Sequence, residues 1–180
     1  YNSNSRLIYL RDDDTGEYWN VGYYPVCRDC DWFECRHGPG YSIVAGATAG
    51  IEAAWRLFVP AGRDPVELWT LTLKNTSRRR RRLSIFAFAE LSLATSYPTY
   101  GHASYLNSML LKRAHGVAAR KVAMNRPNPY GAAVLLSARK PASMDADMNA
   151  FVEQFRTLAN PRALETGRCS GAIASRDRVA

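Results

Sequence analysis

Alternation of side-chain type, residue by residue, runs through three segments of the chain and limits the fold more than any other feature. Successive residues of a β-strand lie on opposite faces of the sheet, so a period of two is typical of strands. The segments are 51–59, 69–74 and 83–93. Their recurring apolar residues are Ile51, Ala53, Trp55, Leu57 and Val59, then Trp69, Leu71 and Leu73, then Leu83, Ile85, Ala87, Ala89, Leu91 and Leu93.

The intervening positions of these segments are not uniformly polar. Phe58, Phe86 and Phe88 lie among them. We therefore expect at least one sheet to be packed on both faces, as the sheets of a sandwich are.

Short joints rich in Gly, Pro, Asn and Asp separate the strand-like segments. They occur at residues 12–16, 46–50 and 60–65. Strands that follow one another across such turns run antiparallel. The pattern predicts an all-β dominated fold, an antiparallel β-sandwich, and the length of 180 residues suits a single domain over residues 1–180.

One segment near residues 144–158 has helical periodicity instead. Its apolar residues recur at spacings of three and four, after Ser143 or Asp145 as a helix cap, and Pro161 follows. We expect one short helix here. The periodic residues are Met144, Met148, Phe151, Phe155 and Leu158.

No stretch of the sequence approaches the roughly 20 apolar residues that a membrane span needs, and no leader is visible, so we expect a soluble, cytoplasmic protein with no membrane partner. The chain starts at Tyr1 rather than at methionine. We interpret it as a piece of a longer, incomplete protein.

The formal net charge is +8, and five of the 24 basic residues form the run Arg78–Arg82. This run directly follows turn residues 74–77, between two strand-like segments. We interpret it as a solvated hairpin tip, with no nucleic-acid partner. Binding of nucleic acid through this run is the weaker alternative.

Four potential zinc ligands lie within eleven residues: Cys27, Cys30, Cys35 and His37. Structural zinc sites usually join two ligand pairs across a longer insert, and here the pairs almost touch. We therefore expect no metal and keep zinc as a weak alternative. Reduced thiols in a cytoplasmic protein are the simpler interpretation.

Aromatic and hydrogen-bonding residues gather without periodicity between Thr95 and Asn107, after the third alternating segment. Flat rings stack on the C–H faces of sugars, while polar groups meet their hydroxyls. The segment therefore suits sugar recognition, although its tyrosines would equally serve to pack a loop on the sandwich. The candidate residues are Tyr97, Tyr100, His102, Tyr105 and Asn107.

Several motifs of the chain resemble glycoside hydrolase family 94, the cellobiose and chitobiose phosphorylases. They include the acidic turn Asp12-Asp13-Asp14-Thr15-Gly16 and Glu34-Cys35-Arg36-His37-Gly38, in the family's order and spacing. The remaining resembling segments are 9–11, 17–19, 40–41, 58–60, 74–77, 145–155 and 168–174. Cys35 belongs to the family's pattern, whereas Cys27 and Cys30 do not.

The resemblance implies an N-terminal super-β-sandwich without the family's catalytic helical toroid. It implies a parent enzyme that performs inverting phosphorolysis of a β-linked disaccharide, with inorganic phosphate as co-substrate and no cofactor. Catalytic residues are then expected downstream, and this piece alone is expected to be inactive. In the family, the loop matching residues 95–107 reaches the active site of the partner subunit in a homodimer, so we expect it to shape the substrate entrance.

A free-standing carbohydrate-binding β-sandwich is the alternative function from another class. Such a module would carry its sugar site without any enzymatic partner. The reading frame that follows residue 180 distinguishes the two hypotheses.

Overall fold

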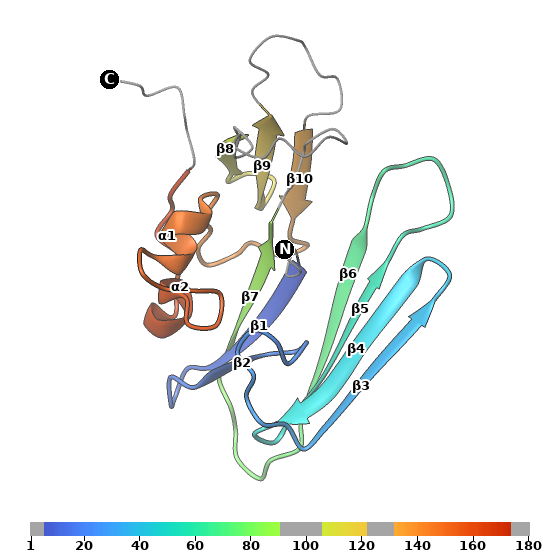
Figure 1. Cartoon of the computed structure of the whole chain (residues 1–180), viewed down its shortest axis with the longest axis vertical. Coiled ribbons are helices and arrows are strands. Elements are labelled where there is room, and N and C mark those ends of the chain that lie inside the picture. The colour runs from blue at the N-terminus through green and yellow to red at the C-terminus, as the bar shows by residue number, and fades with distance from the viewer. Residues whose placement is uncertain (1–5, 91–105, 122–131, 174–180) are drawn as a thin grey trace. The chain divides into compact units, whose positions relative to one another are not determined.

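The computed structural model describes residues 6–90, 106–121 and 132–173, and these residues form ten strands and two helices (Figure 1). The chain divides into two compact units, residues 1–88 and 89–180, and each is described by itself. The strands of the first unit are β1 (Arg6–Asp12), β2 (Tyr18–Asn20), β3 (Trp32–Gly38), β4 (Tyr41–Thr48), β5 (Ile51–Phe58), β6 (Leu68–Asn75) and β7 (Leu83–Ala89). The second unit holds β8 (Leu106–Leu111), β9 (Gly116–Lys121), β10 (Ala132–Leu136), α1 (Met148–Val152) and α2 (Arg162–Thr166).

Strands β3, β4, β5 and β6 form a four-stranded antiparallel sheet in sequence order. The turn between β4 and β5 consists of Ala49 and Gly50, both with positive φ (52° and 76°), which is the geometry of a two-residue hairpin turn. The turn between β3 and β4 is Pro39-Gly40, where Gly40 has φ 75°. Proline followed by a residue of positive φ is typical of a type II turn.

The core of the first unit lies between this sheet and a second sheet of order β2-β1-β7. Ile51, Ala53 and Trp55 of β5 are buried against residues of β1 and β2 and against Val21, as the alternation predicted. We call the face that carries these three residues the inner face of the four-stranded sheet. The other buried members of this core are Ile8, Leu10, Trp19 and Val21.

Strand β7 shows which face of the third alternating segment is the more deeply buried. Phe86 and Phe88 are buried, whereas Ile85, on the opposite face, is 52% exposed. An aromatic ring removes more apolar surface from water than an aliphatic side chain does, so the strand buries its phenylalanine face. Expecting strands packed on both faces was correct for β1, where Leu7, Ile8, Tyr9 and Leu10 are all buried.

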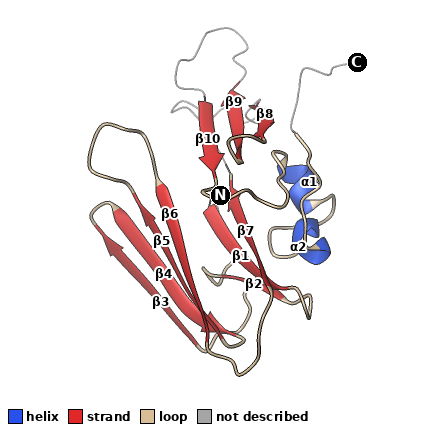
Figure 2. Cartoon of the chain, turned by 180° about the vertical axis from the view of Figure 1, so that it is seen from behind, coloured by secondary structure: helices blue, strands red, loops and turns tan. Residues whose placement is uncertain are grey.

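The helical segment differs from the expectation of one helix near residues 144–158. Helix α1 is only Met148–Val152, and its cap is Asp147, whose carboxylate accepts from the N–H of Asn149, rather than Ser143 or Asp145. The helix ends at Glu153, whose φ of 75° is incompatible with helix continuation. Pro161 does not terminate a helix but precedes α2, which the sequence analysis missed (Figure 2).

Asp145 has a different role from capping. One of its carboxylate oxygens accepts hydrogen bonds from the backbone N–H groups of Ser170, Gly171 and Ala172 and from the Ser170 hydroxyl. A bridge between Ala146 and Ile173 extends this connection. The carboxylate thus joins the two C-terminal segments that carry the family resemblance.

Strands predominate over helices throughout the described residues, so the predicted all-β sandwich class is confirmed (Figure 2). Among those residues, no helix has the length and apolar character needed to cross a membrane. The interpretation of residues 1–180 as one domain stays a prediction.

Candidate functional site

Most of the predicted substrate-entrance loop lies outside the described residues, including Tyr97, Tyr100, His102 and Tyr105. Asn107 is described and belongs to β8, where it pairs with Arg120 of β9. It is therefore part of a strand rather than of an irregular loop. The recognition role of the other four residues stays a prediction.

The cysteine-histidine segment is described in full. Cys27 and Cys30 precede β3, while Cys35 and His37 lie on it. In the described part of the chain, no group of three or more His, Cys, Asp or Glu side chains is placed to hold a metal ion. The structure therefore does not assemble these residues into the zinc site that was kept as an alternative.

Cys35 and His37 instead contact each other. The Cys35 Sγ and His37 Nε2 atoms are 3.2 Å apart, and His37 Nδ1 lies 2.8 Å from the Ser42 hydroxyl oxygen. Ser42 is the residue directly opposite His37 on the neighbouring strand β4. Strand pairing thus explains why these three side chains meet, since opposite residues share a face.

Two of the motifs that carry the resemblance pack together on the outer face of the same sheet. The ring of Tyr41 lies over Gly38, where a Cβ atom would come within 2.3 Å of it. The guanidinium of Arg56 lies 5.8 Å from the centre of the Tyr41 ring and 4.5 Å from that of Phe58. Only glycine leaves room at position 38 for this aromatic and cation contact.

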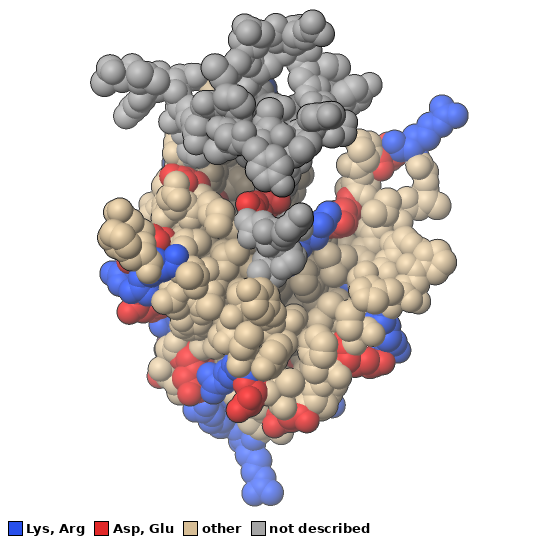
Figure 3. Space-filling model, viewed as in Figure 1, with Lys and Arg blue, Asp and Glu red and all other residues tan. Residues whose placement is uncertain are grey.

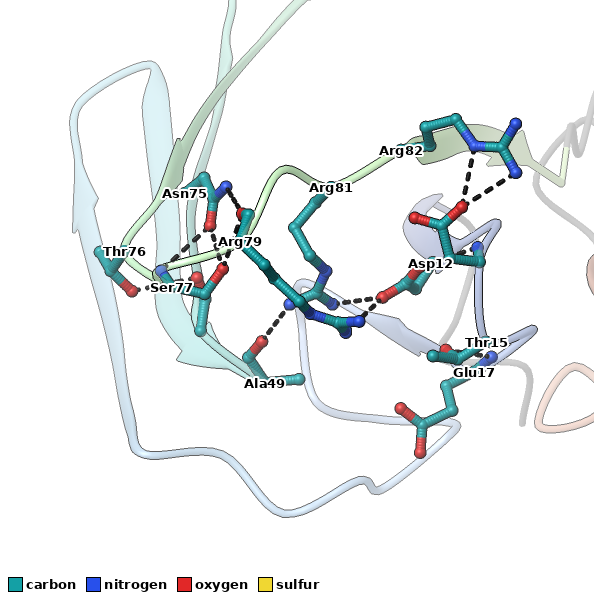
Figure 4. Close-up of polar contacts among 12 residues, drawn as sticks. Asp12, Thr15, Glu17, Ala49, Asn75, Thr76, Ser77, Arg79, Arg81 and Arg82 are labelled. Carbon is teal, nitrogen blue, oxygen red and sulfur yellow. Dashed lines mark hydrogen bonds and ion pairs between the residues drawn. The ribbon is translucent and has the colours of Figure 1, made fainter.

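The acidic residues Asp12, Asp13 and Asp14 form the turn after β1, as expected. The Gly16 N–H donates to the Asp12 carbonyl, and the Asp12 N–H donates to Glu17. The Asp12 side chain is fully buried. Its partners come from the arginine run nearly seventy residues later in the chain (Figure 4).

The arginine run departs from the predicted solvated hairpin tip in two respects. The flanking strands β6 and β7 lie in different sheets, so the run is not a hairpin turn, and one of its five arginines is buried, although the other four are exposed. The side chain of Arg81 is only 3% exposed, and its guanidinium lies 2.6 Å from Asp12 Oδ2 and donates to the Ala49 carbonyl. Arg79 reaches the same Asp12 oxygen at 3.1 Å, and Arg82 pairs with Asp14 at 2.9 Å. Asp12, Arg79 and Arg81 are called the Asp12 cluster below.

The remaining two arginines of the run, Arg78 and Arg80, are exposed and have no side-chain partner within the described residues. Three arginines of the run therefore form ion pairs with the acidic turn, and two make no side-chain contact of this kind. On the face seen in the space-filling view, basic side chains are interspersed with acidic ones rather than forming one continuous stripe (Figure 3). A stripe is what binding along a nucleic-acid backbone requires.

Electrostatics hold Asp12 in its ionised form. Burial by itself would raise the pKa of this carboxyl, but the N–H of Asp14 and the guanidinium groups of Arg81 and Arg79 outweigh burial and lower the pKa below its ordinary value. Oδ1 accepts from Asp14 and Oδ2 from the arginines. A carboxylate so engaged cannot serve as a proton donor near neutral pH, so the cluster is structural rather than catalytic.

The loop that carries the arginines is held by its own polar residues. The Asn75 side chain accepts from Ser77 and donates to the Arg79 carbonyl, while Thr76 donates to the Gly50 carbonyl. Gly50 has φ 76°, and a Cβ there would lie 3.0 Å from Ser77. These contacts place the arginine run beside the turn between β4 and β5 (Figure 4).

Comparison with known proteins gives a match over the whole chain. The family model described as "Glycosyl hydrolase 94, supersandwich domain" matches residues 1–179.

The similar proteins found by this comparison are each named as phosphorylases. Solabiose phosphorylase of Paenibacillus borealis is 36% identical over 176 residues, which cover 97% of this chain and 23% of the relative. N,N'-diacetylchitobiose phosphorylase of Vibrio proteolyticus is 36% identical over 166 residues, 91% of this chain and 21% of the relative. Cellobionic acid phosphorylase of Neurospora crassa is 28% identical over 179 residues, 94% and 21% of the two chains. The chain thus spans between a fifth and a quarter of the length of the curated relatives it matches.

Two arginines of one run provide a matched pair of substitutions. Arg81→Ala leaves the buried Asp12 with only the exposed Arg79 as a charged partner, and we expect it to lower the free energy of unfolding by about 3 kcal/mol. Arg80→Ala removes a guanidinium group of the same charge that is exposed to solvent, and it is expected to change the free energy of unfolding by less than about 0.5 kcal/mol. Urea unfolding followed by tryptophan fluorescence measures both, and equal losses would contradict the structural role of Arg81.

The lowered pKa of Asp12 predicts a pH dependence of stability. A carboxyl whose pKa is lower in the folded state stabilises the fold above its unfolded pKa of about 3.9 and loses that contribution as the pH falls through the folded value. Asp12→Asn removes this titration. We expect the variant to be less stable than the parent at pH 7 and its stability to fall less steeply below pH 5, so that the two curves converge. Parallel curves in urea unfolding between pH 7 and pH 3 would contradict the assignment.

Proposed function

The chain belongs to glycosyl hydrolase family 94 as its supersandwich domain, and from this membership we propose that it is the non-catalytic N-terminal part of an inverting carbohydrate phosphorylase. The proposed parent enzyme cleaves a β-linked disaccharide with inorganic phosphate and releases a sugar 1-phosphate and a sugar. The observation that carries the proposal is the family match over residues 1–179 together with relatives that are named phosphorylases.

The chemistry of the described residues supports a non-catalytic role. Inverting phosphorolysis needs one carboxylic acid to protonate the leaving oxygen, because phosphate itself is the nucleophile. Asp12, which is fully buried, is held ionised by its arginine partners. The motif residues Gly38, Tyr41 and Phe58 pack against one another or against Arg56. These motif residues thus serve the fold, in agreement with catalytic residues that lie elsewhere in the parent protein.

Two finer roles belong to the same proposal. The domain stabilises a homodimer, and residues Tyr97, Tyr100, His102, Tyr105 and Asn107 shape the substrate entrance. All four cysteines are free, which suits the reducing cytoplasm in which we place the enzyme. No organic cofactor or metal is part of the proposed reaction.

Phosphate-dependent release of sugar 1-phosphate tests the main proposal. We expect the complete protein that contains this chain to release it from at least one of solabiose, N,N'-diacetylchitobiose or cellobionic acid, and only when phosphate is present. The 180-residue chain alone is expected to release none. Release by the chain alone would place the catalytic groups within it and overturn the proposal, as would a complete protein that hydrolyses these sugars without phosphate.

The entrance role is tested in the same assay by single substitutions. Tyr97→Ala and Tyr100→Ala each remove a ring that stacks on the sugar, so we expect KM for the disaccharide to rise about tenfold with a smaller change in kcat. Phe155→Ala is the control, since its ring is 97% exposed. Unchanged KM values in both tyrosine variants would remove the loop from the substrate entrance while leaving the phosphorylase proposal intact.

A further inference from the structure

Three side chains that can act as nucleophile, base and hydroxyl lie next to one another on an exposed part of the four-stranded sheet. They are Cys35 and His37 of β3 and Ser42 of β4. Among the described strands, β3 lies at the edge of the four-stranded sheet and pairs with β4 on one side. Cys35 and His37 are two residues apart on it, so their side chains share the inner face, and both are exposed. Ser42 joins them from β4, directly opposite His37.

The hydrogen bonds use both ring nitrogens of His37. Nε2 lies 3.2 Å from the Cys35 sulfur, and Nδ1 lies 2.8 Å from the Ser42 hydroxyl. A neutral imidazole has one donor and one acceptor nitrogen. In the tautomer that carries its proton on Nδ1, His37 donates to the Ser42 hydroxyl and its Nε2 is the acceptor that faces the thiol. This order of nucleophile, base and orienting group is the arrangement that activates thiols.

The two cross-strand rows that contain the pair hold no charged side chain. The residues in register with Cys35 across the sheet are Val44, Trp55 and Leu71, and those in register with His37 are Ser42, Leu57 and Trp69. His37 is therefore the only titratable base in these two rows. Neither row holds a carboxylate that could pair with His37, and neither holds a second base that could take the proton of the Cys35 thiol.

We propose that Cys35 is a reactive thiol site for small electrophiles, peroxide among them, with His37 as general base and Ser42 as a positioning residue. This inference is independent of the proposed phosphorylase role. In the reaction with hydrogen peroxide, the Cys35 sulfur forms a bond to one peroxide oxygen and the O–O bond breaks. The thiol proton passes through His37 Nε2 to the leaving hydroxide, so the products are the Cys35 sulfenic acid and water.

Two of the other three cysteines, Cys27 and Cys169, are internal references for this reactivity. The thiol of Cys27 is exposed and makes no side-chain hydrogen bond within the described residues. Cys169 is half-buried, and burial, together with the charge of Asp145, raises its pKa to about 11. At pH 7.5 Cys27 therefore reports the rate of an unassisted exposed thiol, and Cys169 that of a suppressed one.

Competitive labelling of the whole 180-residue chain tests the proposal. The protein is treated at pH 7.5 with less than one equivalent of iodoacetamide, and in a second series with hydrogen peroxide followed by dimedone to trap sulfenic acid. Peptide mass spectrometry then gives the rate at each cysteine. We expect Cys35 to react about tenfold faster than Cys27 in both series, and Cys169 to react slowest. Equal rates at Cys35 and Cys27 would overturn the proposal.

Variants separate general-base assistance from simple exposure. His37→Gln retains a polar side chain and is expected to lower the Cys35 rate to that of Cys27 while leaving the Cys27 rate unchanged. Ser42→Ala is expected to lower the Cys35 rate less, and Ser42→Thr, which keeps the hydroxyl, to restore it. Circular dichroism confirms that each variant is folded. A Cys35 rate that is unchanged in folded His37→Gln protein would show that the histidine does not act as the base.

Discussion

The buried contact between Asp12 and Arg81 is the constraint on which the first unit of the structure depends. Asp12 ends β1, and Arg81 belongs to the segment that enters β7, so the contact joins two strands of one sheet. The same guanidinium donates to Ala49, in the turn between β4 and β5 of the other sheet. One side chain thus fixes both sheets at one end. A buried carboxylate needs such partners, because an unpaired charge in the interior is strongly destabilising.

The family motifs acquire physical roles from this arrangement. The acidic turn supplies the buried carboxylate, and the residues Asn75, Thr76 and Ser77 shape the loop that delivers Arg81 to it. Gly38 and Tyr41 fit together because the ring occupies the space that a Cβ would take. In each case the motif residue contacts another residue of the same unit rather than lining an open cavity. That is the behaviour expected of a domain that supports an enzyme whose chemistry lies in another part of the protein.

The Cys35 pair has a different character from these structural contacts. Its three side chains are joined by hydrogen bonds at the exposed edge of the sheet rather than in its core. In the sequence, the proximity of Cys35 and His37 to Cys27 and Cys30 left a zinc site as a weak alternative, and Ser42 was not considered. The sheet register explains the actual outcome: it places Ser42 opposite His37, and the period of two puts Cys35 on the same face.

The sequence by itself determined strands β5, β6 and β7 and the inward side of β5, because alternation acts over a few neighbouring positions. It did not predict β3 and β4, nor that β7 belongs to the other sheet. Recognisable motifs likewise identified the family. Only the tertiary structure decided that Phe86 and Phe88 are buried while Ile85 is exposed, that Arg81 is buried while Arg80 is exposed, and that Pro161 precedes a helix. These outcomes depend on partners far along the chain. Asp12 and Arg81 are separated by almost seventy residues. No local sequence pattern indicates which acidic and basic side chains will pair once the two sheets are packed together.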